Sequence, residues 1–429
     1  MGKSAKKRSE GQGETIAEQR ALPLAALMFT LRRGLREFVV EAGMQALETL
    51  MEDERTQLCG PRYRHDAKRR AMRAGHAPGE VVMGGRKVRV ARPRVRSADG
   101  RQEIPLPAWE QFSDEDPLRK DAVEKMLVGV STRKYKRALD EMPPEVDEFS
   151  TSKSAVSRRF VAATSKQLHQ WLERDLSPLC LAAILIDGLA FDEHLVLIAL
   201  GVDAEGKKHV LGLHEGATEN EAACGALLDD IIGRGVSPLR SMLFVIDGAK
   251  ALHKAIVARF GSRALVQRCQ VHKARNVKDH LPDELRPSVA ATMRQAYAMH
   301  DYKAAKRQLE SLARQLDDEH PGAAASVREG LVETLTVVRL GLPRSFARTF
   351  ATTNPIENLN SSARWTCRNV KRWRGGTMVL RWACAAVREA EQRFRAVKGA
   401  KSGMPILLEA LRQNDIKLEK NIDAIAEAA

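Results

Sequence analysis

The chain has 429 residues, of which 70 are lysine or arginine and 55 are aspartate or glutamate, so its formal net charge is +15. This basic excess favours a polyanionic partner, above all nucleic acid, although a solvated basic surface would give the same balance. No apolar run approaches the roughly 20 residues of a membrane-spanning helix and the six cysteines include no C-x-x-C pair, which argues against a membrane protein or a disulfide-stapled secreted one and favours the cytoplasm.

The N-terminal part is expected to be helical, with one small hairpin. Residues 1–18 are rich in Lys, Gly, Ser and Glu and predict a disordered tail. In the region 19–113, apolar residues three and four apart predict helix between Glu18 and Leu58. Farther on, alternating valines on both sides of Gly84-Gly85 predict a β-hairpin with an arginine-rich face.

Residues 114–175 predict a helix-turn-helix DNA-binding region made of three short helices. These helices are Pro117–Leu127, Thr132–Asp140 and a third that begins at Ser152 or Ser154 and reaches Leu172. Arg158 and Arg159 lie in the first turns of the third helix, where a recognition helix faces base edges and phosphates. An ordinary three-helix linker would give the same pattern.

Residues 176–281 change to an α/β pattern. The expected strands are Leu181–Ile186, His194–Val202, His209–Leu213 and, after a helix over Glu219–Ile232, Met242–Ile246 and Ala264–Arg268. Three antiparallel strands, then a helix and a further strand, is the order of an RNase H-like core. That order would bring the ends of the first and fourth strands side by side.

The rest of the chain predicts helices. No strand is visible in residues 282–350, residues 351–398 return to the core as a helix, and residues 399–429 carry one more helix. The predicted fold is therefore α/β and multi-domain, with an RNase H-like core that an all-helical insertion interrupts. Helical and helix-turn-helix DNA-binding regions precede this core.

Three acidic residues lie at positions where they could bind metal ions. Asp187 and Asp247 each follow an apolar strand, and Glu357 lies at an expected helix start. Either aspartate by itself is better explained as the opening of an Asp-Gly turn, and Glu357 fits a capping box with Asn354 as the cap and Pro355 next to it. Two neighbouring carboxylates, however, are costly unless a cation lies between them. Three acids together would hold two divalent ions, Mg²⁺ or Mn²⁺, which can cleave and rejoin phosphodiesters.

Other residues suggest contacts around these acids. Cys269 and His272 are half of a zinc site at best, so we expect them to pack beside the acids or to steer DNA. Trp365 and Trp373 are expected in the core, and the cations after Glu357 either grip phosphates or form a solvated helix face. The candidate DNA-contacting residues are Arg133, Ser154, Arg158, Arg159, His272, Lys273, Arg275, Arg364, Arg368, Lys371 and Arg372.

Taken together, these motifs resemble the Mutator-type transposases of bacterial insertion sequences, members of the DDE group. The matching stretches are GVSTR (129–133), SKSAVSR (152–158), LIDG (185–188), ALGVDAEGKKHVLGL (199–213), FVIDG through QRCQVHKARNV (244–277) and TTNPIENLNSSAR (352–364). The resemblance covers about residues 60 to 397. One departure follows Gly188, where this chain reads LAFDEH and many relatives carry an aromatic residue and basic ones.

The resemblance implies that Asp187, Asp247 and Glu357 are the catalytic, metal-holding triad, with two Mg²⁺ or Mn²⁺ ions, and that Cys269 and His272 form a C-x-x-H signature. It also implies binding of double-stranded DNA at terminal inverted repeats, strand cleavage, and joining of the 3′-hydroxyl to target DNA. Cutting two ends together calls for a homodimer or a higher oligomer. The expected location is the bacterial cytoplasm, on the nucleoid when DNA is bound.

Two other functions remain open from the residues. A domesticated transposase could keep its DNA-binding region and act as a non-catalytic regulator. A junction nuclease on the same fold would cut branched DNA without strand transfer.

Overall fold

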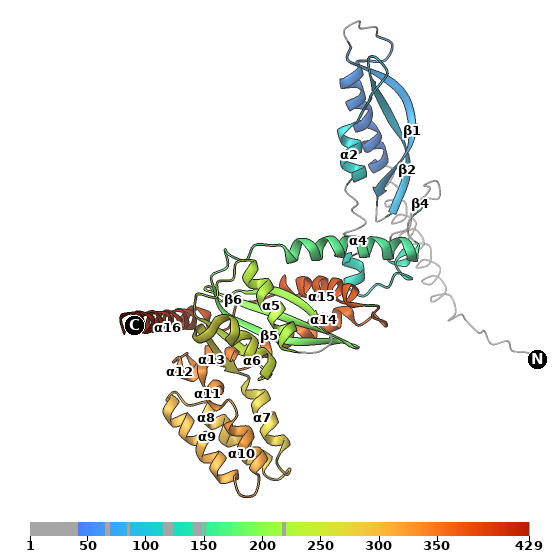
Figure 1. The fold of residues 1–429 in the computed structure, drawn as a ribbon. Coiled ribbons are helices and arrows are strands. Elements are labelled where there is room, and N and C mark those ends of the chain that lie inside the picture. Colours follow the sequence, from blue (N-terminus) through green and yellow to red (C-terminus); the bar gives the residue numbers. More distant parts are fainter. Residues whose placement is uncertain are drawn as a thin grey trace, which may run out of the picture. The chain divides into compact units, whose positions relative to one another are not determined.

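The computed structural model describes residues 42–64, 69–83, 86–114, 123–139, 148–149, 152–216 and 220–428. The chain divides into two compact units (Figure 1). The first contains residues 1–126 and 130–163, and the second contains residues 127–129 and 164–429. The expected tail 1–18 and the first part of the helix expected from Glu18 lie outside the described residues.

The first unit is built on a long antiparallel hairpin. β1 (Ala71–Met83) pairs with β2 (Arg86–Ser97) from one end to the other, so the predicted hairpin is confirmed and is longer than expected. Its inward valines pack with the helix over 42–59 and with α2 (Pro107–Asp114) in one apolar cluster. The arginines of β2 alternate with these valines, because successive side chains of a strand point to opposite faces.

The remainder of the first unit differs from the three short helices expected between 114 and 175. Two-residue strands, β3 (Glu103–Ile104) and β4 (Glu148–Phe149), pair with β2. The helix expected over Thr132–Asp140 is wrong, since only a 3₁₀ turn, η1 (Lys136–Ala138), forms there. Of the first expected helix, residues 123–127 are described and are helical.

The third expected helix is confirmed but is long. α4 (Lys153–Leu172) has 20 residues and passes from the first unit into the second. Ser152 is the cap, because its hydroxyl accepts the Ala155 N–H at 3.3 Å.

The second unit contains a five-stranded mixed sheet. Its strands are β5 (Leu181–Phe191), β6 (His194–Asp203), β7 (Lys208–Gly216), β8 (Met242–Ile246) and β9 (Ala264–Arg268). They lie in the order β7-β6-β5-β8-β9, with the first three antiparallel and β8 and β9 parallel to β5. All five expected strands are confirmed. β5, however, continues to Phe191, so Asp187 lies inside its strand and not at its end.

Helices cover both faces of this sheet. Ile184 and Ile186 of β5 pack in one cluster with α5 (Glu221–Gly233) and α6 (Lys250–Phe260). α14 (Asn354–Cys367) packs on β5 as well, and α15 (Gly376–Glu391) packs on β6 and β7. β5 is therefore buried on both sides, which explains why its sequence is continuously apolar instead of alternating. Because side chains alternate along the strand, Asp187 points away from Ile186, to the side of α14.

A helical region separates β9 from α14. It contains α7 (Gln270–Asp279), α8 (Arg286–Tyr297), α9 (Tyr302–Leu316), α10 (Pro321–Arg328), α11 (Leu331–Thr334), α12 (Thr336–Arg339) and α13 (Arg344–Phe350). α7 to α12 share a hydrophobic core distinct from the one under the sheet. In Figure 1 the helices α7 to α10 lie below the sheet. As predicted, residues 282–350 contain no strand.

The C-terminal part contains three helices where two were expected. The expected helix from 355 to 397 is broken between α14 and α15 by residues 368–375, with Gly375 at a φ of 143°. α16 (Ala400–Ala428) then follows, as predicted for the tail. Among the helices that the structure describes, none has both the length and the apolar character needed to span a membrane.

Candidate catalytic site

The two aspartates lie level with one another on adjacent strands. β5 and β8 are parallel, with Leu185 opposite Val245, and the same offset brings Asp187 opposite Asp247. β8 ends at Ile246, so Asp247 follows its strand directly while Asp187 remains within β5. The parallel pairing is what brings two acids 60 positions apart in the chain to one level of the sheet.

The Asp-Gly turn interpretation is right for one aspartate and wrong for the other. Asp247 does open a turn, because its Oδ1 accepts the Ala249 N–H at 2.9 Å and Gly248 has a φ of 111°. This turn leads into α6. Asp187 opens no turn, since β5 pairs with β6 without interruption as far as Phe191.

Glu357 lies in the first turn of α14, but the expected capping box is wrong, because it does not form. The cap is Thr353 and not Asn354, and the Thr353 side chain makes no capping bond to a backbone N–H. Instead its hydroxyl donates to Glu357 Oε1 at 2.5 Å. The start of the helix therefore fixes the direction of the Glu357 carboxylate.

Asn360 joins α14 to the first aspartate. Its Nδ2 donates to Asp187 Oδ2 at 2.8 Å, and only 2 % of the residue is exposed. The Oδ1 atom of Asn360 is buried without a hydrogen-bond partner among the described residues. Such an atom is costly in a folded protein, which points to a ligand or a water at this position.

The carboxyl group of Asp187 has an unusual pKa. Burial, and then the negative charges of Asp247 and Glu357, raise the pKa of Asp187 to about 6. The backbone N–H of Gly188 and the nearby His272 act in the opposite direction. The three predicted acids are thus close enough to repel one another, and a cation bound among them would relieve that repulsion.

Cys269 and His272 lie beside Glu357, in agreement with the expectation that they pack near the acids. The Thr353 hydroxyl is 3.4 Å from both Cys269 Sγ and His272 Nδ1, and His272 Nε2 is 3.9 Å from Glu357 Oε1. In the described parts of the chain, Cys269, His272 and Glu357 are the one group of three potential ligands whose donor atoms all lie within 4.8 Å.

The thiol and the imidazole polarise each other. Burial raises the pKa of Cys269, but hydrogen bonds from His272 and Thr353 outweigh it, so that the net pKa is lowered. The hydrogen bond to Cys269 in turn raises the pKa of His272. The pair is therefore biased towards thiolate and imidazolium next to the carboxylates.

The predicted DNA-contacting residues have different environments. Exposed side chains are Arg133, Ser154 and Arg158 in the first unit and Arg275, Arg364, Arg368, Lys371 and Arg372 in the second. Arg159 and His272 are partly buried. Lys273 is only 4 % exposed, and its ammonium group donates to Ser326 O at 2.9 Å and lies 3.4 Å from Glu329. That ammonium group is already bound inside the protein.

The tryptophans also differ from the prediction that they belong to the core. Trp365 is 58 % exposed, and the Arg368 guanidinium lies 3.6 Å from the centre of its ring. Trp373 is partly buried and packs on Phe191, with ring centres 4.7 Å apart.

Two residues next to the acids were missed in the sequence. Thr353 and Asn360 lie four positions before and three positions after Glu357, in the stretch TTNPIENLN that carries the family resemblance. Those spacings bring side chains to one face of a helix, so a search around Glu357 at helical spacing would have found them.

Comparisons with known proteins agree with this geometry. A family described as "Transposase, Mutator family" matches residues 19–397. The chain is 28% identical to a transposase for insertion sequence element ISRM5 of Rhizobium meliloti over 340 residues, covering 77% of this chain and 81% of the relative. It is 29% identical over 383 residues to the IS406 transposase of Burkholderia multivorans, covering 85% and 94%. For the IS1081 transposase of Mycobacterium tuberculosis the identity is 26% over 354 residues, 78% of each chain. Because the family match extends over most of its length, the chain belongs to the Mutator family of transposases.

Proposed function

We propose that this chain binds the terminal inverted repeats of its insertion sequence, cleaves a DNA strand there by metal-dependent hydrolysis and joins the freed 3′-hydroxyl to target DNA. The observation that carries the proposal is the parallel pairing of β5 and β8, whose register brings Asp187 and Asp247 next to each other across the two strands. Glu357 is near enough to raise the pKa of Asp187. The strand order β7-β6-β5-β8-β9 supports an RNase H-like core around these acids.

The donor set fits two divalent ions of the magnesium type. Asp187, Asp247 and Glu357 offer only carboxylate oxygens, which are hard ligands suited to Mg²⁺ or Mn²⁺. The raised pKa of Asp187 and the unpartnered Oδ1 of Asn360 both indicate a site that lacks positive charge. When bound, such ions would activate the attacking water and stabilise the leaving oxygen of the phosphodiester.

The protein's own residues have supporting tasks. Asn360 and Thr353 hold the carboxylates of Asp187 and Glu357 in fixed directions through their hydrogen bonds. Arg364, an exposed residue that follows Glu357 on α14, and Arg368 just beyond this helix would bind the phosphates on either side of the cut bond.

The test uses purified protein, Mg²⁺ or Mn²⁺, and labelled DNA carrying the inverted repeats that flank its gene. We expect cleavage at the repeat ends followed by joining of the 3′-hydroxyl. Asp187→Asn, Asp247→Asn and Glu357→Gln should abolish cleavage and retain DNA binding, whereas Asp318→Asn, an exposed acid of the helical region, should cleave normally. Wild-type cleavage by any of the three active-site variants would refute the proposed triad.

The same experiment separates the other functions. Tight binding without metal-dependent cutting would indicate a non-catalytic regulator, and cutting of branched DNA without end specificity or joining would indicate a junction nuclease. If two ends are cut together, the active species should be a homodimer or a higher oligomer on DNA, which light scattering of the complex would measure.

A further inference from the structure

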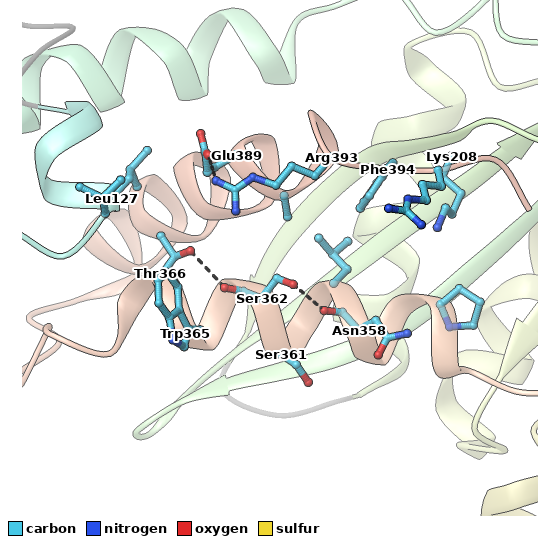
Figure 2. A pocket seen from close by; sticks show the side chains of 15 residues that line it. Leu127, Lys208, Asn358, Ser361, Ser362, Trp365, Thr366, Glu389, Arg393 and Phe394 are labelled. Atoms are coloured by element: carbon cyan, nitrogen blue, oxygen red, sulfur yellow. Dashed lines mark hydrogen bonds and ion pairs between the residues drawn. The ribbon is translucent and has the colours of Figure 1, made fainter.

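A pocket of about 660 Å³ is lined by residues of α14, by the end of α15 with the segment that follows it, and by Lys208 of the sheet. Figure 2 shows Asn358, Ser362 and Trp365 along α14, with Arg393 facing them from beyond the end of α15. Phe394 and Lys208 of β7 are at one end. The volume is within the range of pockets that hold small organic molecules, the size class of a nucleotide.

The pocket and the catalytic acids share one helix. Successive residues of a helix are turned by about 100°, so α14 can direct Glu357 and Asn360 towards the sheet and Asn358 and Ser362 into the pocket. Pro355 and Asn358, on either side of Glu357 in the chain, both line the pocket. A strand whose phosphate lies at the acids therefore needs to pass only around α14 to reach the pocket.

The charge of the pocket suits an anion. Its fifteen lining residues, all described, include three cations, Lys208, Arg393 and Arg395, against one carboxylate, Glu389. Glu389 pairs with Arg393, but the Arg393 side chain is 73% exposed, so a phosphate could displace this ion pair at little cost. The excess positive charge remains available to a ligand.

The pocket also contains aromatic rings on which a base could stack. Trp365 is exposed although it is large and apolar, and Arg368 lies over one side of its ring. Lys208 lies 5.0 Å from the centre of the Phe394 ring at the other end of the pocket. Aromatic platforms alternating with cations are how proteins hold unpaired nucleic acid, because every base has a face that stacks.

We propose that this pocket binds unpaired nucleotides of the DNA strand next to the bond that is cut, with a base on Trp365 and a phosphate at Arg393. This inference rests on the proposed function. A paired base in a duplex is stacked on both faces and cannot enter a concave pocket, so the site distinguishes an opened strand end from intact double helix. It would therefore retain the strand between cleavage and joining.

The test measures binding of a short fluorescent oligothymidylate, and of the same strand in a duplex, to the full-length protein without divalent metal. Trp365→Ala should weaken single-strand binding about tenfold or more and duplex binding much less. Arg393→Ala should also weaken single-strand binding. Arg412→Ala is the matched control, since Arg412 is likewise an exposed arginine paired with a glutamate close to it in the sequence.

A conservative variant at the same position tests whether a loss of binding in Trp365→Ala reflects misfolding. Trp365→Phe should retain most of the affinity, but it should lose most of the tryptophan quenching that single-stranded DNA causes in the wild type. Because the readout is binding without divalent metal, a failure of the proposed cleavage would not be mistaken for a failure of the pocket. Unchanged single-strand affinity in Trp365→Ala, or equal losses for single strand and duplex, would overturn the proposal.

Discussion

Asp187 has an energetic cost of ionisation that a bound cation would relieve. A carboxyl group whose pKa is raised from 3.8 to about 6 costs the folded protein about 3 kcal/mol once it is ionised. The cost is absent below the unfolded pKa, near pH 4, and is complete above pH 6. Stability contributed by the protonated group is therefore lost as the pH rises through this window.

Asp187→Asn should remove this cost. In EDTA at pH 8 we expect the variant to melt several degrees above the wild type, with the difference shrinking towards pH 4. Saturating Mg²⁺ should raise the melting temperature of the wild type and have much less effect on the variant. Equal melting temperatures at pH 8 in EDTA would show that burial and the two neighbouring acids impose no such cost on the ionised Asp187. Asp318→Asn serves as the control for an exposed acid.

Asn360 should act as a positioning residue for Asp187. Asn360→Ala removes the donor at 2.8 Å from Asp187 Oδ2, and we expect a 10- to 100-fold loss of cleavage, about the range found when a partner of a metal ligand is removed. Asn360→Asp should raise the pKa of Asp187 further, because it adds a like charge. The pH for half-maximal cleavage should then move upwards in Asn360→Asp and in Asn360→Ala less so. A purely structural role would lower the melting temperature and leave the pH profile unchanged.

At the scale of elements, the start of α14 lacks the usual side-chain capping hydrogen bond. Thr353 is fully buried at the cap position, yet its hydroxyl is directed to Glu357 and to the Cys269–His272 pair instead of a backbone N–H. A normal capping bond is worth about 1 kcal/mol. Here that contribution is missing, and the hydroxyl instead fixes the orientation of Glu357, which we propose to be catalytic.

Thr353→Val tests this assignment, because valine has nearly the same shape without the hydroxyl. We expect cleavage to fall about 10- to 100-fold while DNA binding is retained. Thr353→Ser keeps the hydroxyl and should restore most of the activity. If Val and Ser variants cleave equally well, the hydroxyl does not orient Glu357.

Much of the fold was predictable because the core strands are short apolar runs. The sheet strands, the hairpin and the helical region between 282 and 350 follow from hydrophobic periodicity. The continuation of β5 past Asp187 did not follow from this periodicity, because Asp187-Gly188 has the sequence of a turn. Pairing with β6 through Phe191 opposite His194 overrides that local preference.

The missed residues of the site depend on contacts that are distant in sequence. The partner of Asn360, Asp187, is 173 positions away, so helical spacing places this asparagine near Glu357 but does not identify its partner. Trp365 was expected in the core because it is apolar. Its exposure is decided instead by its position on the helix. Trp365 comes two residues after the buried Ala363, which turns it to a different face of α14.

On the scale of the whole molecule, the net charge of +15 does not identify which lysine and arginine side chains would contact DNA. Lys273 and Arg372 were both predicted to contact it. The ammonium group of Lys273 is buried against Ser326 and Glu329, whereas Arg372 is exposed in the segment between α14 and α15. The structure thus separates a cation that stabilises the fold from one that is available to phosphates.

Arg372→Ala should therefore weaken duplex binding for all sequences alike and reduce the slope of log K against log salt by about one, because one phosphate contact releases about one counterion. Lys273→Met should leave that slope unchanged and lower the melting temperature, since it removes a donor inside the helical region. Both quantities come from salt titrations of binding and thermal melting of the same two variants. If Lys273→Met reduced the salt slope, or if Arg372→Ala left it unchanged, burial would not decide which of these cations binds DNA.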